Sequence, residues 1–104
     1  MFDDLLLPMF DDEYYPDILV AEVKQLILRF GKQIASGALT EDEVYHVAHN
    51  VIDQINEMKP QFDDLESSLD DTAADYIAEA MMMLAQEYGY LDLEIENLIA
   101  NREW

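Results

Sequence analysis

The chain has 104 residues, with 24 acidic residues against five Lys and Arg and a formal net charge of -19. This length suits one domain, and a hydrophobic content of 51% separates the chain from disordered acidic sequences. The charge excludes direct binding to nucleic acids or anionic membranes, which needs basic contacts, and the lack of Cys excludes disulfides and thiol chemistry.

The sequence predicts an acidic and hydrophobic arm at residues 1–15, ahead of a single helical domain at residues 16–104. Two outcomes are open for this arm: its apolar residues dock on the domain, or the arm is mobile and folds on a partner. The N-terminus has no basic stretch of a signal peptide, and no apolar run approaches ~20 residues. These features predict a cytoplasmic protein.

The most apolar helical pattern of the chain covers residues 17–36. Pro16 suits a helix start because a first-turn N–H has no helical acceptor, and Gly37 suits a left-handed C-terminal cap. Apolar residues recur at helical spacing at Leu19, Val23, Leu26, Ile27, Phe30 and Ile34. The pattern predicts a central helix that several neighbours bury.

A second helix is predicted at residues 41–66. Thr40 and Glu43 match a capping box at its start. Pro60 removes a backbone donor and clashes with the preceding turn, so we expect a kink near this residue.

Two further helices are predicted in the C-terminal half. Residues 72–88 follow Asp70 and Asp71, either of which is a suitable N-cap. Residues 93–100 follow Asp92, which we expect to cap the last helix. Four helices with short connections, and no strand alternation of useful length, predict an all-α bundle.

Three segments of the chain, taken together, resemble a known family. Met9–Val20 contains Phe-Asp-Asp-Glu-Tyr-Tyr-Pro, Leu98–Trp104 reads Leu-Ile-Ala-Asn-Arg-Glu-Trp, and Glu-Tyr-Gly-Tyr lies between them at 87–90. Over residues 9–104 the chain resembles the short acidic bacterial proteins catalogued as domain of unknown function 5713. Pro60 departs from the uninterrupted helix that this resemblance implies. The resemblance implies a bacterial, soluble, helical protein and nothing catalytic.

One group of side chains has the spacing of metal ligands. Glu43, His46 and His49 contain a Glu-x-x-His motif, which ferritin-like bundles use for metals. Those sites need two such motifs, and this chain has one. Asp42, His46, His49 and Asp53 lie opposite the apolar stripe of their helix, so we expect a solvated face. A small metal-binding helical protein that uses Glu43, His46 and His49 is one alternative function.

Nothing in the sequence predicts catalysis. Ser36, Ser67 and Ser68 lie near helix ends or turns without a nearby His, and there is no Gly-rich phosphate loop. We therefore predict a protein that is not an enzyme and has no cofactor.

An aromatic pair beside acids indicates a protein-binding surface instead. The candidate partner-binding residues here are Asp11, Asp12, Glu13, Tyr14 and Tyr15. Aromatic rings supply buried area, and carboxylates steer a basic protein toward them. For Tyr15 the alternative is packing at the start of the following helix.

These patterns predict a non-enzymatic acidic protein that neutralises or regulates a basic partner. It would act as an immunity-type inhibitor or as a nucleic-acid mimic whose carboxylates stand in for phosphates; colicin-type immunity proteins also carry Tyr-Tyr-Pro beside acids. The first alternative is a structural or adaptor homodimer. Such a dimer would use a leftover apolar face, for which Leu28 and Met82 are candidates, although Met82 also suits a core position.

Overall fold

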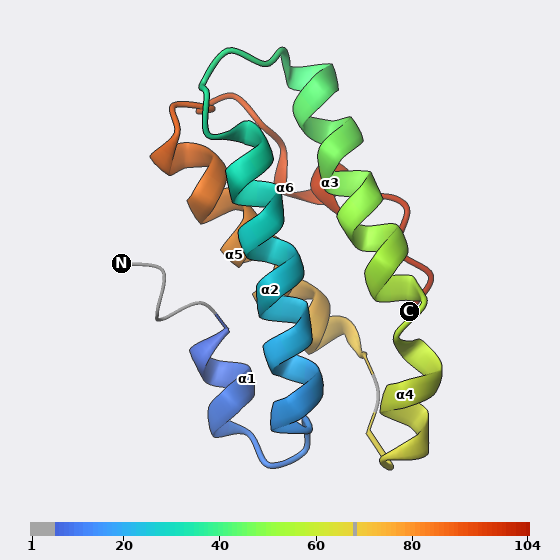
Figure 1. Cartoon of the computed structure of the whole chain (residues 1–104). Coiled ribbons are helices and arrows are strands. Elements are labelled where there is room, and N and C mark those ends of the chain that lie inside the picture. Colours follow the sequence, from blue (N-terminus) through green and yellow to red (C-terminus); the bar gives the residue numbers. More distant parts are fainter. Residues whose placement is uncertain (1–5, 68) are drawn as a thin grey trace.

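The computed structural model describes residues 6–67 and 69–104, and these residues form helices and turns without a strand (Figure 1). The helices of this described part are α1 (Leu7–Asp11), α2 (Asp17–Ile34), α3 (Glu41–Asn56), α4 (Lys59–Asp64), α5 (Asp71–Glu87) and α6 (Ile95–Leu98). The predicted all-α fold is confirmed. Within these residues, no helix combines the length and hydropathy that crossing a bilayer requires.

α2 lies at the centre of the fold and contacts α1, α3 and α5. Figure 1 shows α3 beside α2 and α5 behind it. A Cβ on Gly31 would lie 3.3 Å from Leu84 Cδ1, so glycine at this position lets α2 and α5 approach closely. The helix ends at Ile34, and Gly37 has the predicted left-handed conformation, with a φ of 72°.

α3 begins with the predicted capping box. Glu43 N–H donates to Thr40 Oγ1 at 3.2 Å, and Thr40 N–H donates to Glu43 Oε1 at 3.0 Å. The prediction of one kinked helix over residues 41–66 is wrong, because α3 ends at Asn56 and α4 begins at Lys59. A proline clashes with the carbonyl four residues earlier, and for Pro60 that residue is Asn56. Pro60 instead occupies the first turn of α4.

The described part of the N-terminal arm docks on the domain. Leu6, Met9 and Tyr15 are buried members of the core, and α1 contacts α2 and α5. The sequence left open whether the arm docks on the domain or is mobile until it meets a partner, and residues 6–15 dock. Residues 1–5 of the arm lie outside the described residues.

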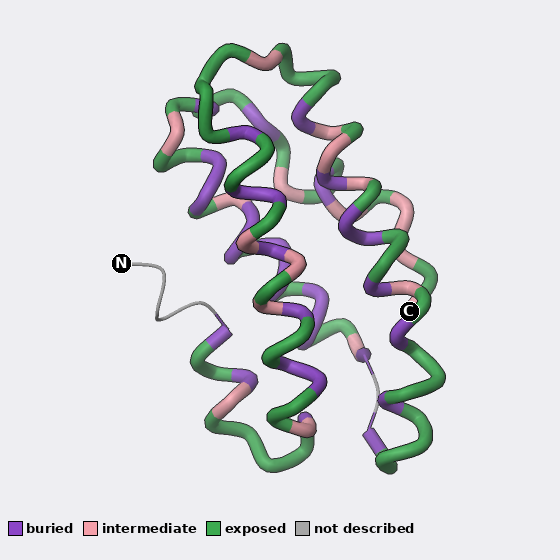
Figure 2. The backbone as a smooth tube through the Cα atoms, viewed as in Figure 1, coloured by how far each residue is buried: buried purple, intermediate pink, exposed green. Residues whose placement is uncertain are grey.

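The C-terminal half keeps one predicted helix and shortens the other. Asp70 Oδ1 caps α5 by accepting a hydrogen bond from Ala73 N–H at 2.9 Å. The predicted helix over residues 93–100 is only Ile95–Leu98, and its N-cap is Glu94 instead of Asp92. The backbone leaves the helix early because the following residues bond to α3. Figure 2 shows the buried residues on the inner sides of the long helices.

Candidate functional site

The end of the chain is fastened to α3 by side-chain hydrogen bonds. Asn101 Nδ2 donates to the His49 carbonyl at 2.9 Å and to Asp53 Oδ1 at 2.8 Å. Asn56 Nδ2 donates to the Asn101 carbonyl at 3.2 Å, and Asn56 Oδ1 accepts from Glu103 N–H at 2.9 Å. These bonds hold α6 and the last residues in place, and α6 in turn contacts α5.

A groove lies between α5 and this C-terminal segment. It consists of two adjoining hollows of about 580 and 350 Å³, which share Asp75, Glu96 and Ile99. The other residues that line it are Asp71, Ala74, Ala78, Glu79, Ile95, Ala100, Arg102 and Trp104. We call this feature the acidic groove.

The acidic groove combines carboxylate walls with an apolar floor. Asp71, Asp75 and Glu79 recur every four residues and therefore share one side of α5. Glu96 contributes a carboxylate from α6 on the other wall. The apolar residues between the walls are the buried Ala74 and Ala78 and the half-buried Ile95 and Ile99. Such a surface suits a ligand with an apolar strip bordered by cations.

One basic side chain already occupies an end of the acidic groove. Arg102 Nη2 lies 3.2 Å from Asp71 Oδ1, and the guanidinium carbon lies 5.5 Å from the centroid of the Trp104 ring. Arg102 Nη1 also donates to the Trp104 carbonyl oxygen at 2.6 Å. The Asp71 side chain is 95% exposed, so its ion pair with Arg102 is weak and exchangeable. The chain itself thus shows that a guanidinium fits this end.

The predicted partner-binding residues divide into exposed and buried members. Asp11, Asp12, Glu13 and Tyr14 are exposed, and the exposed fraction of Tyr14 is 45%. Asp12 Oδ1 accepts a hydrogen bond from Tyr14 N–H at 2.9 Å, which fixes the turn between α1 and α2.

Tyr15 packs inside the domain, so the prediction that it contacts a partner is wrong. Its side chain is 2% exposed, and its hydroxyl donates to Asp70 Oδ1 at 2.7 Å. Burial, followed by the hydrogen bond to Asp70, raises the pKa of the Tyr15 hydroxyl well above its ordinary value. The bond also holds Tyr15 against Asp70, the N-cap of α5 and the residue before Asp71 of the acidic groove.

Met82, a candidate for partner binding, is half buried and packs against the core. It therefore exposes little surface to a partner. The larger exposed methionine of this segment is Met83, with an exposed fraction of 44%. Leu28, the other apolar candidate, is also half buried.

Two of the three candidate metal ligands, Glu43 and His49, have other partners. The Glu43 side chain serves the capping box, and His49 Nε2 lies 2.8 Å from the Asn97 carbonyl oxygen. His49 is therefore half covered by the C-terminal segment, and the prediction that it faces solvent is wrong, whereas Asp42, His46 and Asp53 are exposed as predicted. Within residues 6–67 and 69–104, no group of three or more His, Cys, Asp or Glu side chains is arranged to hold a metal ion.

The sequence alone did not indicate the acidic groove, because only one of its walls has a local sequence pattern. The spacing of Asp71, Asp75 and Glu79 could have revealed one wall, because four-residue intervals share a helix face. The opposite wall depends on where the C-terminal segment docks, and no local pattern specifies that.

The fold and the groove together define a small, acidic, all-α protein with a carboxylate-lined surface groove. A family model matches residues 2–104, so the chain belongs to the Family of unknown function (DUF5713). The match confirms the resemblance over residues 9–104 and extends it to residues 2–8. No curated protein and no solved structure matches the chain.

Proposed function

We propose that this protein binds a basic protein partner and neutralises or regulates it by receiving a cationic segment in the acidic groove. The single observation that carries the proposal is the continuous groove with carboxylates on both walls and apolar residues between them. An amphipathic basic segment would place its apolar side chains against Ile95 and Ile99 and its cations near the carboxylates. The partner's function would be blocked where that segment normally contacts an anionic target.

Arg102 marks the place in the groove where an arginine of the partner would bind. Its guanidinium occupies the end of the groove near Asp71 and Trp104, so an incoming arginine would exchange with it at that position. The exposed Asp11, Asp12 and Glu13 belong to the turn before Tyr15, whose hydroxyl bonds Asp70 at the start of α5, and they would steer a basic partner toward the protein and raise its association rate. Tyr14 would add aromatic contact area.

The charge of the whole protein supports this direction of recognition. A net charge of -19 attracts cationic proteins over a range of about 8–10 Å at physiological salt. Charge alone does not select a partner, however. The groove supplies selection because only a segment with both cations and apolar side chains matches its walls and its floor.

The test uses Trp104, which is the chain's single tryptophan and lines the groove. Its fluorescence is titrated with a synthetic amphipathic peptide that carries Arg and Leu on opposite faces. The variant Asp75→Lys with Glu96→Lys should weaken binding by about tenfold or more, since close charge pairs carry much of such an interface. The matched control is Asp63→Lys with Asp64→Lys on α4, which changes net charge equally outside the groove.

Equal weakening in both double variants would show that the peptide responds only to net charge, and it would refute the groove as the binding site. A basic protein captured from cells of the source organism should likewise be lost from the groove variant and retained by the control. Raised salt should weaken that complex, because exposed charge pairs are screened.

A further inference from the structure

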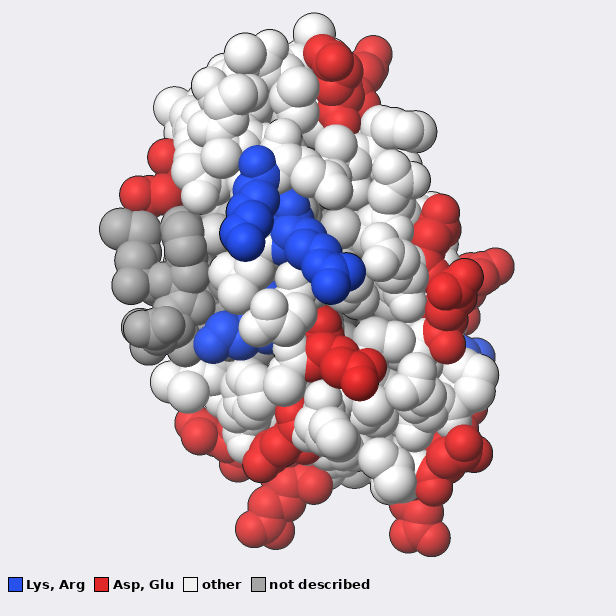
Figure 3. All heavy atoms as spheres, viewed as in Figure 1, with Lys and Arg blue, Asp and Glu red and all other residues white. Residues whose placement is uncertain are grey.

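The outer side of α2 is exposed even though α2 is the central helix. Ile18 is 69% exposed, Ala21 and Gln25 are exposed, and Leu28 is half buried. This helix also carries three of the five Lys and Arg residues, namely Lys24, Arg29 and Lys32. Figure 3 shows basic side chains gathered over α2, with acidic side chains mostly toward the edges of the same face.

Two copies of this protein repel each other over most of their surfaces, because each has a net charge of -19. The outer side of α2 is where this repulsion is least, since it brings Arg29 and Lys32 to the surface. Within the described residues, the ion pair formed is Arg102–Asp71, so Glu22, Arg29 and Lys32 are not engaged in one. Their charges are available to a partner.

The spacing on α2 fits an antiparallel pairing with a second copy of the same helix. Ile18, Gln25 and Lys32 are seven residues apart, and so are Ala21 and Leu28, which is the repeat of helices that pair along a seam. A two-fold axis at Gln25 would bring residues at equal distances on opposite sides of Gln25 to the same height.

This symmetry pairs opposite charges. Arg29 lies four residues after Gln25 and Glu22 three residues before it, so each Arg29 would come within one residue of the level of the partner's Glu22. Lys32, seven residues after Gln25, would likewise come within one residue of the level of the partner's Asp17, eight residues before it, and each pair would occur twice. Leu28 would pack against the partner's Ala21. The sequence of α2 is thus complementary to itself in the antiparallel direction, with its two acids in its first half and two of its three cations, Arg29 and Lys32, in its second. A parallel pairing would instead set like charges against each other.

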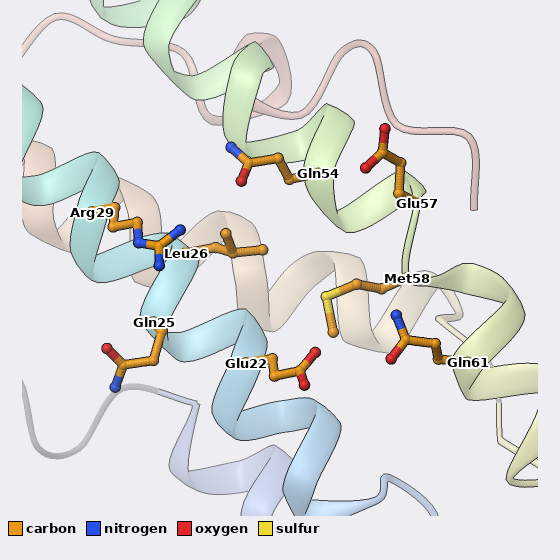
Figure 4. Close-up of a pocket in the computed structure, with 8 residues that line it drawn as sticks. All are labelled: Glu22, Gln25, Leu26, Arg29, Gln54, Glu57, Met58 and Gln61. Atoms are coloured by element: carbon orange, nitrogen blue, oxygen red, sulfur yellow. The ribbon is translucent and has the colours of Figure 1, made fainter.

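Hollows flank α2 on both sides and would receive side chains of the second copy. One, of about 430 Å³, lies between α2 and the α3–α4 junction, and the other, of about 250 Å³, lies between α2 and α5. Gln25 and Arg29 line both hollows. Figure 4 shows Glu22 and Arg29 projecting from α2 on one side of the larger hollow, with the carboxylate and the guanidinium apart from each other.

We propose that the outer side of α2 is the interface of a symmetric homodimer, formed by antiparallel pairing of α2 with the α2 of a second copy. The interface does not use the acidic groove, which lies on α5 and α6, so this inference stands or falls independently of the proposed function. One helix pair buries less than the ~800 Å² per partner of a standard interface. The dimer is therefore weak, with a dissociation constant on the order of 10–100 µM.

The test is sedimentation equilibrium from about 10 µM to about 1 mM protein at physiological salt, where general repulsion is screened beyond ~8 Å. Glu22→Arg and Arg29→Glu should each raise the dissociation constant about tenfold or more, because each sets like charges opposite one another. The double variant swaps the pair and should return to within about threefold of the wild type. Lys59→Glu on α4 is the matched control for Arg29→Glu, with the same change in net charge.

Rescue by the charge swap is the decisive result, because a role in folding alone would not produce it. Circular dichroism of the single variants checks that these exposed substitutions keep the helical fold. A monomer at every concentration, a dimer that Arg29→Glu leaves unchanged, or a double variant no better than the singles would each overturn the proposal.

Discussion

The hydrogen bond between Tyr15 and Asp70 gives the sharpest prediction about stability. Replacing Tyr15 with Phe removes a buried hydroxyl that donates to Asp70 Oδ1 at 2.7 Å and leaves the ring in place. Hydrogen bonds to charged groups contribute about 1.5–3 kcal/mol. Asp70 is half buried and keeps its second bond, to Ala73 N–H, so we expect a loss near the lower end, about 1.5 kcal/mol.

The same bond predicts a pH dependence with a definite sign. The pKa of Tyr15 is raised in the folded protein, first by burial and then by Asp70, above the value of about 10 that it has in the unfolded chain. Below pH 10 both states keep the proton, so the stabilisation is fully present. Above pH 10 the unfolded chain loses the proton first, and the free energy of unfolding falls by about 1.4 kcal/mol per pH unit from this group.

The assay is urea unfolding of wild type and Tyr15→Phe between pH 8 and pH 11.5, followed by far-ultraviolet circular dichroism. The other tyrosines titrate in both proteins, so the difference between the two isolates Tyr15. It should be about 1.5 kcal/mol up to pH 9.5 and vanish near pH 11. Tyr76→Phe, which keeps a half-buried ring and removes a hydroxyl with no hydrogen bond among the described residues, is the control and should change stability by less than about 0.5 kcal/mol. A difference that stays constant across this range would refute the reasoning.

Two further predictions concern the C-terminal segment and the turn after α2. Asn101→Ala removes the hydrogen bonds to the His49 carbonyl and Asp53 and should lower the free energy of unfolding by about 2 kcal/mol. In the mutant, hydrogen exchange of the last ten residues should accelerate more than exchange of α2. Equal exchange rates of these residues in mutant and wild type would contradict the prediction. Gly37→Ala forces a side chain onto a residue with a φ of 72° and sets its Cβ 3.2 Å from the Tyr88 carbonyl oxygen. We expect a loss of about 1–2 kcal/mol, seen as a lower thermal midpoint, and an unchanged midpoint would speak against the left-handed turn.

Local chemistry predicted the features that depend on a few neighbouring residues. The capping box of Thr40 and Glu43 is present because both partners lie within one helical turn. Gly37 adopts a positive φ because only glycine reaches that region without steric cost. The influence of Pro60 was predicted, but as a kink near that residue, whereas the helix ends at Asn56, because the proline ring clashes with the carbonyl four positions earlier.

Features that depend on distant residues were not predictable in the same way. The groove, its Arg102–Asp71 pair and the cover over His49 all follow from the docking of the last residues on α3. That docking joins positions about 50 residues apart through asparagine side chains, which carry no hydrophobic period. The exposure of Ile18 likewise depends on which neighbours reach the start of α2.

The amino-acid sequence by itself determined the helical class, the positions of α2, α3 and α5, the family and the acidity, because periodicity, caps and charge are local or additive properties. Only the tertiary structure decided that Tyr15 is a buried donor, that the carboxylates of α5 face a second acidic wall, and that the basic side of α2 lies open. These outcomes depend on which surfaces meet, and burial is a property of the packed chain rather than of any one segment.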